Sequence, residues 1–256
     1  MNTFKTFTRG LSAGAFTLVL TACADRAPAP SAIEQLADEY LAELKESDAL
    51  MGTYYSIDDS RHDRLPDNSL AAMAAWEAKE DAWLAKLARI DAPAEIGSRD
   101  WVTYGLLKEQ LEGATATRIC RNELWGASTT TSWHTWLPFV FNIQPLETTD
   151  LRAQALARLG AVRTYIDNEI ANLREGLRLG YSAPRVTVEA VPDQVRSLIG
   201  PDSIFMGPAA RSNDTDFQAA VTEIYDEQIA PALHRYADFI EDEYLSEARE
   251  TLAVLG

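Results

Sequence analysis

Apolar residues in the second half of the chain recur at helical spacing. Between residues 150 and 180 they step by 3, 3, 4, 4, 3 and 4 along one series: Leu156, Leu159, Val162, Ile166, Ile170, Leu173 and Leu177. Side chains at this spacing share one face of an α-helix. We therefore predict a long helix from about residue 150 to Gly180, because glycine commonly follows the last residue of a helix.

The same spacing predicts helices elsewhere in the chain. Ser31 and Glu34 match a capping box, so a helix is expected to begin there. Further helices are predicted at about 69–90, about 98–112, about 184–198 and about 214–253. Pro192 and Pro231 fall inside the last two, and we expect them to interrupt or kink these helices, since proline lacks the amide donor of a regular helix.

No such period runs through residues 113–150, where Thr, Ser, Trp, Pro and Phe predominate. We expect a long, aromatic-rich irregular loop there. Alternation of apolar and polar residues, which is typical of a half-buried strand, does not extend beyond a few positions in the sequence. The prediction is one all-α domain of about six helices over residues 31–256.

The first 22 residues resemble a secretory signal peptide. Lys5 and Arg9 form a cationic region before an apolar stretch over residues 11–20, which is too short to span a bilayer as a stable helix. The stretch ends in Leu20-Thr21-Ala22-Cys23, which looks like the lipobox of bacterial lipoproteins. This resemblance implies cleavage before Cys23 and acylation of its thiol. The alternative is an ordinary signal peptide with a cysteine near its cleavage site.

The residues after Cys23 indicate a location and a tether. Lipoproteins of this type that lack aspartate directly after the cysteine usually reach the outer membrane, and Ala24 stands at that position. The resemblance thus implies lipid anchoring to the periplasmic face of the outer membrane of a Gram-negative bacterium. Residues 23–30 end in alternating Ala and Pro, which favours an extended tether over a packed element.

Net charge argues against two classes of partner. The chain has 256 residues, of which 23 are Lys or Arg and 39 are Asp or Glu, so its net charge is −16. Removal of residues 1–22 takes away two basic residues and leaves −18. Such an acidic protein repels phosphate backbones and anionic headgroups. We expect no nucleic-acid partner, and no membrane contact except through the lipid on Cys23.

Motifs for metal binding are missing from the sequence. Its three histidines are His62, His134 and His234, and none has a second histidine within five residues, as a helical zinc site requires. The sequence also contains no Gly-rich phosphate loop after a strand and no Cys-x-x-Cys. We predict no catalytic residue, no metal ligand and no cofactor within this chain.

The best candidates for ligand contact lie in the expected loop. Trp133, His134 and Trp136 combine apolar surface with polar ring atoms, as a pocket for a peptide or small organic ligand requires. The alternative is that they fill the space between helices. Arg185, at a predicted helix start, is a candidate to clamp a carboxylate. Its alternative role is an ion pair with Glu189, four residues on.

Three segments, taken in order, resemble one protein family. They are Arg64-Leu65-Pro66-Asp67-Asn68-Ser69, then Asn172 to Gly180 followed by Ala183-Pro184-Arg185, and then Pro231-Ala232-Leu233 through Glu243-Tyr244-Leu245. Together they resemble the N-terminal half of a bacterial helical family, domain of unknown function 885, many of whose members are exported lipoproteins. The resemblance extends from about residue 31 to about residue 250 and implies an all-helical fold.

Members of that family look like all-helical zinc metallopeptidases. In them, His-Glu followed one turn later by His supplies metal ligands and a general base, and this motif lies in the second half of the family fold. The present sequence has no His-Glu dipeptide and ends at Gly256. The resemblance therefore implies that zinc and the catalytic residues belong to a half that this chain lacks.

Three hypotheses on function follow, and they leave open whether the chain is itself an enzyme. The first is the substrate-covering N-terminal part of an exported zinc-dependent peptidase-like lipoprotein, inactive alone. The second is a stand-alone outer-membrane lipoprotein that binds a ligand or a partner protein without catalysis, and a purely structural role is the third. If a half is missing, an apolar face is expected to be exposed, and we place it between Val221 and Tyr244. Self-association through that face is the corresponding prediction.

Overall fold

Helices form every regular element in residues 29–57 and 60–252, which are the residues that this computed structural model describes. The predicted all-α class is confirmed. The expected signal peptide, Cys23 and most of the expected tether lie outside the described residues. Within the described part of the chain, no helix is both long enough and apolar enough to cross a membrane.

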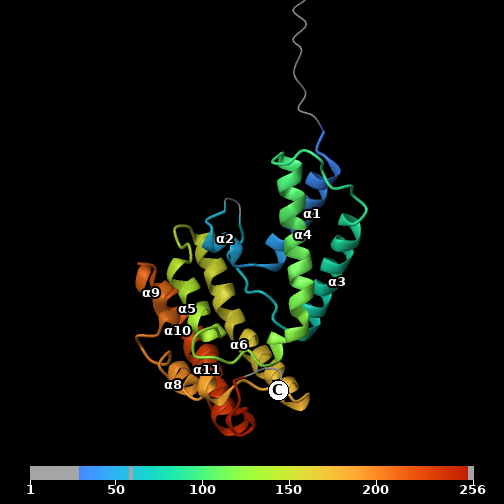
Figure 1. The fold of residues 1–256 in the computed structure, drawn as a ribbon. Helices are drawn as coiled ribbons and strands as arrows, with labels where there is room; N and C mark the ends of the chain where they lie inside the picture. Colours follow the sequence, from blue (N-terminus) through green and yellow to red (C-terminus); the bar gives the residue numbers. More distant parts are fainter. Residues whose placement is uncertain (1–28, 58–59, 253–256) are drawn as a thin grey trace, which may run out of the picture. The chain divides into compact units, whose positions relative to one another are not determined.

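Three helices pack around a small core of their own (Figure 1). They are α1 (Ala32–Ser47), α3 (Leu70–Leu87) and α4 (Arg99–Thr117), and we call them the three-helix group. Their buried apolar residues are Ile33, Leu36, Trp83, Leu87, Leu107 and Leu111. A serine caps the start of each helix, and the predicted capping box of Ser31 and Glu34 is confirmed.

The other helices surround α6 (Thr149–Arg178), which runs through a larger core (Figure 1). We call them the α6 group. The longer members are α5 (Trp133–Ile143), α8 (Val191–Arg196), α10 (Thr215–Ile224) and α11 (Ala230–Phe239). The shorter members are α2 (Met51–Tyr54), α7 (Arg185–Val188), α9 (Gly207–Arg211) and α12 (Leu245–Glu247).

The long helix predicted between residue 150 and Gly180 is confirmed as α6. The buried part of its apolar stripe consists of Leu159, Val162, Ile166, Ile170 and Leu173. The chain leaves the helix at Gly180, whose φ of +84° lies in the left-handed region that favours glycine. The amide of Tyr181 then donates to the carbonyl oxygen of Gly176 (2.8 Å), which satisfies one of the last helical carbonyls.

The prediction of an irregular loop over residues 113–150 is wrong for residues 133–143, which form the helix α5. This helix is buried on most of its circumference, through Trp133, His134, Leu137, Pro138, Val140 and Phe141. A helix that is apolar on most sides has no amphipathic period to detect. Pro138 within it also reads as a helix breaker, although a buried helix tolerates the single hydrogen bond that proline removes. Around α5, the segments 125–132 and 144–148 are irregular, as expected.

The prolines act on the two last predicted helices in different ways. Pro192 lies in the first turn of α8, and the expected interruption is confirmed, since the predicted helix 184–198 is divided into α7 and α8. Pro231 lies in the first turn of α11, and a wide π-helical turn, Tyr225–Ile229, precedes it. A proline cannot donate to the carbonyl four residues back, so a widened turn accommodates it without a break. The described helices end at Glu247, before the predicted residue 253.

The prediction of an exposed apolar face between Val221 and Tyr244 is also wrong, because this face is buried. Its main residues, with Tyr225 and Phe239, are buried within this chain: Val221, Ile229, Leu233, Tyr236, Ile240 and Tyr244. Helices α6 and α8 of the same chain cover them. The pattern identified an apolar face correctly, but its partner is internal. Self-association itself stays a prediction.

Candidate functional site

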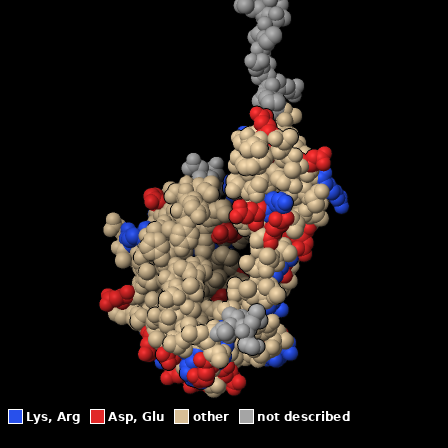
Figure 2. Space-filling model, in the orientation of Figure 1, with Lys and Arg blue, Asp and Glu red and all other residues tan. Residues whose placement is uncertain are grey.

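A cleft of about 970 Å³ lies between the three-helix group and the α6 group. Its lining comes from the end of α1, the segment around α2, the extended segment 64–67, α3, the end of α4, the turn Asn122–Leu124 and one residue of α5. Figure 2 shows the hollow and the acidic side chains that gather at its edge. A concave site of this size is in the range of ligand pockets, so the cleft is the candidate site.

Aromatic side chains from three helices line the cleft. Tyr54 comes from α2, Trp76 from α3 and Trp136 from α5. Trp76 packs edge-on against Trp83 in the core of the three-helix group, with ring centroids 5.4 Å apart. Trp136 packs edge-on against Tyr165 of α6, at 6.3 Å. Each of the two indoles is therefore held by a second ring behind it.

A partly buried ion pair joins α3 to the end of α4 at the same wall. Glu80 accepts from Nε1 of Trp76 (2.8 Å) and from Nη2 of Arg118 (2.8 Å). Arg118 also donates to Asp81 (2.7 Å) and to the carbonyl oxygen of Glu77 (3.1 Å). Burial disfavours the charged form of Arg118, but the carboxylates of Glu80 and Asp81 outweigh it and raise the pKa of Arg118. The pair fixes the position of the Trp76 indole.

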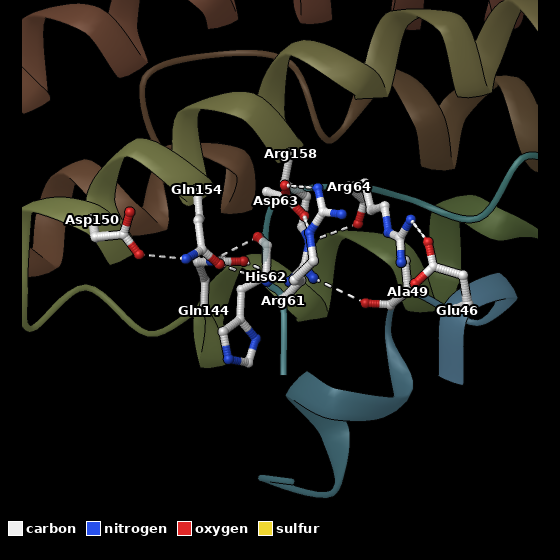
Figure 3. A network of polar contacts seen from close by, with 10 residues as sticks. All are labelled: Glu46, Ala49, Arg61, His62, Asp63, Arg64, Gln144, Asp150, Gln154 and Arg158. Carbon is white, nitrogen blue, oxygen red and sulfur yellow. Dashed lines mark hydrogen bonds and ion pairs between the residues drawn. The ribbon is translucent and has the colours of Figure 1, made fainter. Parts of the chain in front are cut away.

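The guanidinium of Arg158 fastens the opposite edge of the cleft (Figure 3). Arg158 is fully buried in α6 and donates to four neutral acceptors: the carbonyl oxygens of Arg64 (2.9 Å) and Ala49 (3.0 Å), Oγ1 of Thr53 (2.8 Å) and Oε1 of Gln144 (2.6 Å). Burial lowers the pKa of Arg158 to about 10, so it remains protonated at neutral pH. These bonds tie residues 49–64 to α5 and α6.

His62 belongs to the same network and has a defined hydrogen-bonding role. Oγ1 of Thr53 accepts from Arg158 and lies 2.8 Å from Nδ1 of His62. Both groups are satisfied when the threonine hydroxyl donates its one hydrogen to Nδ1, which leaves the imidazole proton on Nε2. Burial, together with the positive charge of Arg158, lowers the pKa of His62 and favours this neutral form.

The extended segment that carries Asp67 into the cleft is also held by α6. Nδ2 of Asn68 donates to the carbonyl oxygen of Tyr165 (3.0 Å) and to Oε1 of Glu169 (2.8 Å). Asn172 donates in turn to the carbonyl oxygen of Asn68 (2.8 Å). Burial raises the pKa of the Glu169 carboxyl. Asn68 and Asn172 come from the first and second segments of the family resemblance, so these two segments are direct neighbours.

A glycine lets a short turn cross α6 at the cleft. The turn Asn122–Leu124 packs on the helix at Gly176, where an added Cβ would lie 1.8 Å from the carbonyl oxygen of Leu124. Only a residue without a side chain fits at that distance. The turn supplies Asn122 and Glu123 to the cleft lining, so Gly176 positions part of the wall.

The structure places the ligand-contact candidates that the sequence suggested in different parts of the molecule. Trp136 lines the cleft. Trp133 and His134 are 2% and 5% exposed and lie in the core, where Nε2 of His134 is 2.9 Å from Oε1 of Gln194. Their burial fits the alternative that they fill space between helices. Arg185 lies away from the cleft lining and pairs with Glu250 (2.7 Å), so the partner expected at Glu189 is replaced.

Sequence reasoning missed the residues of the α3 wall. Trp76, Glu80, Trp83 and Leu87 follow one another at steps of four, three and four, so they share a helix face. A carboxylate on an otherwise apolar face was the available signal, because such a group must find a partner inside the fold. Its partner, Arg118, is 38 residues further along the chain and could not be found from local spacing.

The histidines do not meet in a metal site. His62 is engaged with Thr53, His134 with Gln194, and His234 is exposed on α11. Within residues 29–57 and 60–252, no three His, Cys, Asp or Glu side chains are grouped so that they would hold a metal ion. The described residues therefore do not fit the zinc that the family resemblance implies, and we derive no step through it.

Comparison with known proteins gives a family. The model of a bacterial protein family of unknown function, DUF885, matches residues 47–254 of the chain. This match contains all three segments quoted above for the resemblance. No curated protein matches the sequence.

Proposed function

Since the chain belongs to the bacterial family of unknown function DUF885, we propose that it binds a peptide or small organic ligand in the cleft between the three-helix group and the α6 group. In this proposal the chain is the substrate-covering part of an exported zinc-peptidase-like lipoprotein, is inactive alone, and is anchored by Cys23 to the periplasmic face of the outer membrane. The cleft carries the proposal. Its volume is in the range of ligand pockets, and its lining combines aromatic and charged side chains, as a ligand site requires.

Contacts behind the cleft wall hold the side chains that a ligand would touch. Trp76 and Trp136 are each backed by another aromatic ring, and the edge at residues 64–67 is tied to α6 through Arg158 and Asn172. A site whose side chains are already ordered loses little entropy when a ligand binds. These contacts therefore favour a preformed binding site.

Trp76 and Trp136 also give the test. In a fluorescence anisotropy assay with the full chain and short fluorescein-labelled peptides of mixed sequence, Trp76→Ala and Trp136→Ala should each weaken binding about tenfold, because each removes an aromatic contact surface. Trp101→Ala is the matched control, since Trp101 lies outside the cleft lining and is 43% exposed. If no peptide binds, or if all three variants bind like the wild type, the proposed function is wrong.

The export part of the proposal has a separate test, because acylation requires the Cys23 thiol. Cells that express the chain are expected to incorporate labelled palmitate into it, and Cys23→Ser should abolish this label. Cys120→Ser is the control, because Cys120 lies far beyond the lipobox-like segment. An unlabelled, water-soluble wild type contradicts the lipoprotein proposal without affecting the cleft.

A stand-alone binding lipoprotein is the second candidate. In this proposal the side chains with which this chain lines the cleft bind the ligand by themselves. The two candidate functions predict different results when a catalytic half from a full-length DUF885 protein is added to the chain. Association of the two, with hydrolysis of the bound peptide, supports the first candidate. Binding without association supports the second.

A further inference from the structure

The charged groups of the cleft are unequal in number and in pairing. Six carboxylates line it, against three cationic side chains: Glu46, Asp48, Asp67, Glu77, Glu80 and Glu123 against Arg64, Lys79 and Arg118. All three cations already have carboxylate partners. Arg64 pairs with Glu46 (2.5 Å), Lys79 with Glu43 (2.6 Å), and Arg118 with Glu80 and Asp81. No cation of the lining is left for an anionic ligand.

Three of the carboxylates have no such partner. Asp48, Asp67 and Glu77 make no ion pair with any residue in the described part of the chain. Asp48 and Asp67 use one oxygen each to accept from the backbone amides of Leu50 (3.1 Å) and Ser69 (2.9 Å). These local bonds fix the direction of the two carboxylates and leave their negative charge uncompensated.

The aromatic wall favours the same ligand charge. The faces of Tyr54, Trp76 and Trp136 carry partial negative charge and attract cations. At Tyr54, burial and the negative charge of Asp48 together raise the pKa of the phenol, which agrees with a negative potential on that side of the cleft. Rings and carboxylates together match a ligand with apolar stems and cationic ends, the chemistry of lysine and arginine side chains.

We infer that the cleft selects peptides with Lys or Arg side chains, whose cationic groups are received by Asp48, Asp67 and Glu77 beside the aromatic wall. This inference rests on the proposed function, because it names the class of ligand for the same cleft. Asp48 directly follows α1 and Glu77 lies on α3, both in the three-helix group, whereas Asp67 lies in the extended segment before α3. A bound peptide would therefore bridge the segment fastened to α6 and the three-helix group.

The test uses the full chain and three fluorescein-labelled peptides that differ only at two positions, which are Lys, Gln or Glu. In low salt the wild type should bind the Lys peptide at least about tenfold more tightly than the Gln peptide, and added salt should reduce this preference. The triple variant Asp48→Asn, Asp67→Asn, Glu77→Gln should bind the Lys and Gln peptides about equally. The asparagines keep the oxygen that accepts from the backbone, so the local structure is retained.

A second triple variant controls for net charge. Asp226→Asn, Glu227→Gln and Asp242→Asn also remove three negative charges, but from exposed positions outside the cleft lining. This control should keep the wild-type preference. Equal loss of preference in both triple variants overturns the inference, since the effect then comes from net charge alone. Equal binding of all three peptides by the wild type overturns it as well but leaves the proposed function standing, whereas no binding of any peptide overturns both.

Discussion

The three-helix group and the α6 group handle charge and burial in opposite ways. The three-helix group has six buried apolar residues, and apart from the partly buried pair of Arg118 with Glu80 its ion pairs, such as Lys86–Glu39, lie on the surface. The α6 group has a far larger core and encloses the guanidinium of Arg158, which makes no ion pair with any carboxylate in residues 29–57 and 60–252. A small core with surface pairs opens at lower cost than a large core with a satisfied buried charge. The cleft thus has one stable side and one weaker side.

The largest expected effect comes from breaking the buried network of the α6 group. Arg158→Met leaves the acceptors on Thr53, Gln144 and Ala49 without a donor, so the free energy of unfolding should fall by about 3–5 kcal/mol. Urea unfolding followed by circular dichroism measures it. Arg163→Met is the matched control on the same helix. Its exposed pair with Asp167 should contribute less than about 1 kcal/mol, and equal losses in both variants contradict the account.

The next pair of substitutions tests whether the three-helix group and the α6 group open separately. Leu111 in the three-helix group and Leu159 in α6 are both fully buried, so each change to alanine should cost about 2–4 kcal/mol. Leu111→Ala should speed amide hydrogen exchange in α1, α3 and α4 and leave α6 protected. Leu159→Ala should speed exchange in both groups. If Leu111→Ala also exposes α6, the two groups form one cooperative unit and the comparison is wrong.

A smaller loss is expected at the crossing of Asn122–Leu124 over α6. Gly176→Ala places a Cβ against the carbonyl oxygen of Leu124, so the turn must shift, at a cost of about 1–3 kcal/mol. Gly160→Ala is the control in the same helix, because a Cβ there meets open space. It should stabilise the protein by up to about 1 kcal/mol. Thermal unfolding compares the two, and a loss at Gly160 would contradict the account of the crossing.

The smallest effect is a pH dependence in the α6 group. Because burial raises the pKa of Glu169, the native state holds this proton more tightly than the unfolded state. The free energy of unfolding should therefore decrease as pH rises from about 4.5 through the raised pKa, by at most about 1.4 kcal/mol per pH unit. Glu169→Gln should remove this decrease in urea unfolding.

Glu175 supplies the opposite control for this pH dependence. The hydrogen bonds from Arg178 lower the pKa of Glu175, so its contribution is present above the ordinary carboxyl pKa and is lost as pH falls. Glu175→Gln should thus reduce stability at neutral pH and change little in acid. If Glu169→Gln shows the same pH profile as the wild type, the enclosed carboxyl does not affect stability.

Local patterns predicted the parts of the fold whose reasons are local. The α6 stripe, the glycine that ends it and the capping box at Ser31 all depend on residues within a few positions of one another. The burial of α5 and of the face between Val221 and Tyr244 depends on helices far away in the sequence. Periodicity shows that a face is apolar, but the partner that covers it is set by the tertiary fold.

The candidate site was harder to predict from the sequence, because it too depends on residues that are far apart in the chain. Of the aromatic candidates, Trp136 faces the cleft, while Trp133, three residues earlier, faces the core. Residues three apart lie on nearly the same side of a helix, so choosing between them requires knowing which helices pack against each residue of α5. The Arg158 network joins residues 49, 53, 64 and 144, and nothing in the local sequence links these positions.

The two fastening points of α6 also limit how its length can vary. Arg158 and Gly176 are 18 residues apart, which is about five full turns, so the network and the crossing turn meet the same side of the helix. Deletion or insertion of one residue between them would rotate one point by about 100° relative to the other, and both could no longer be satisfied. Length variation in related chains is therefore expected in the loops and at the ends of α6, outside this interval.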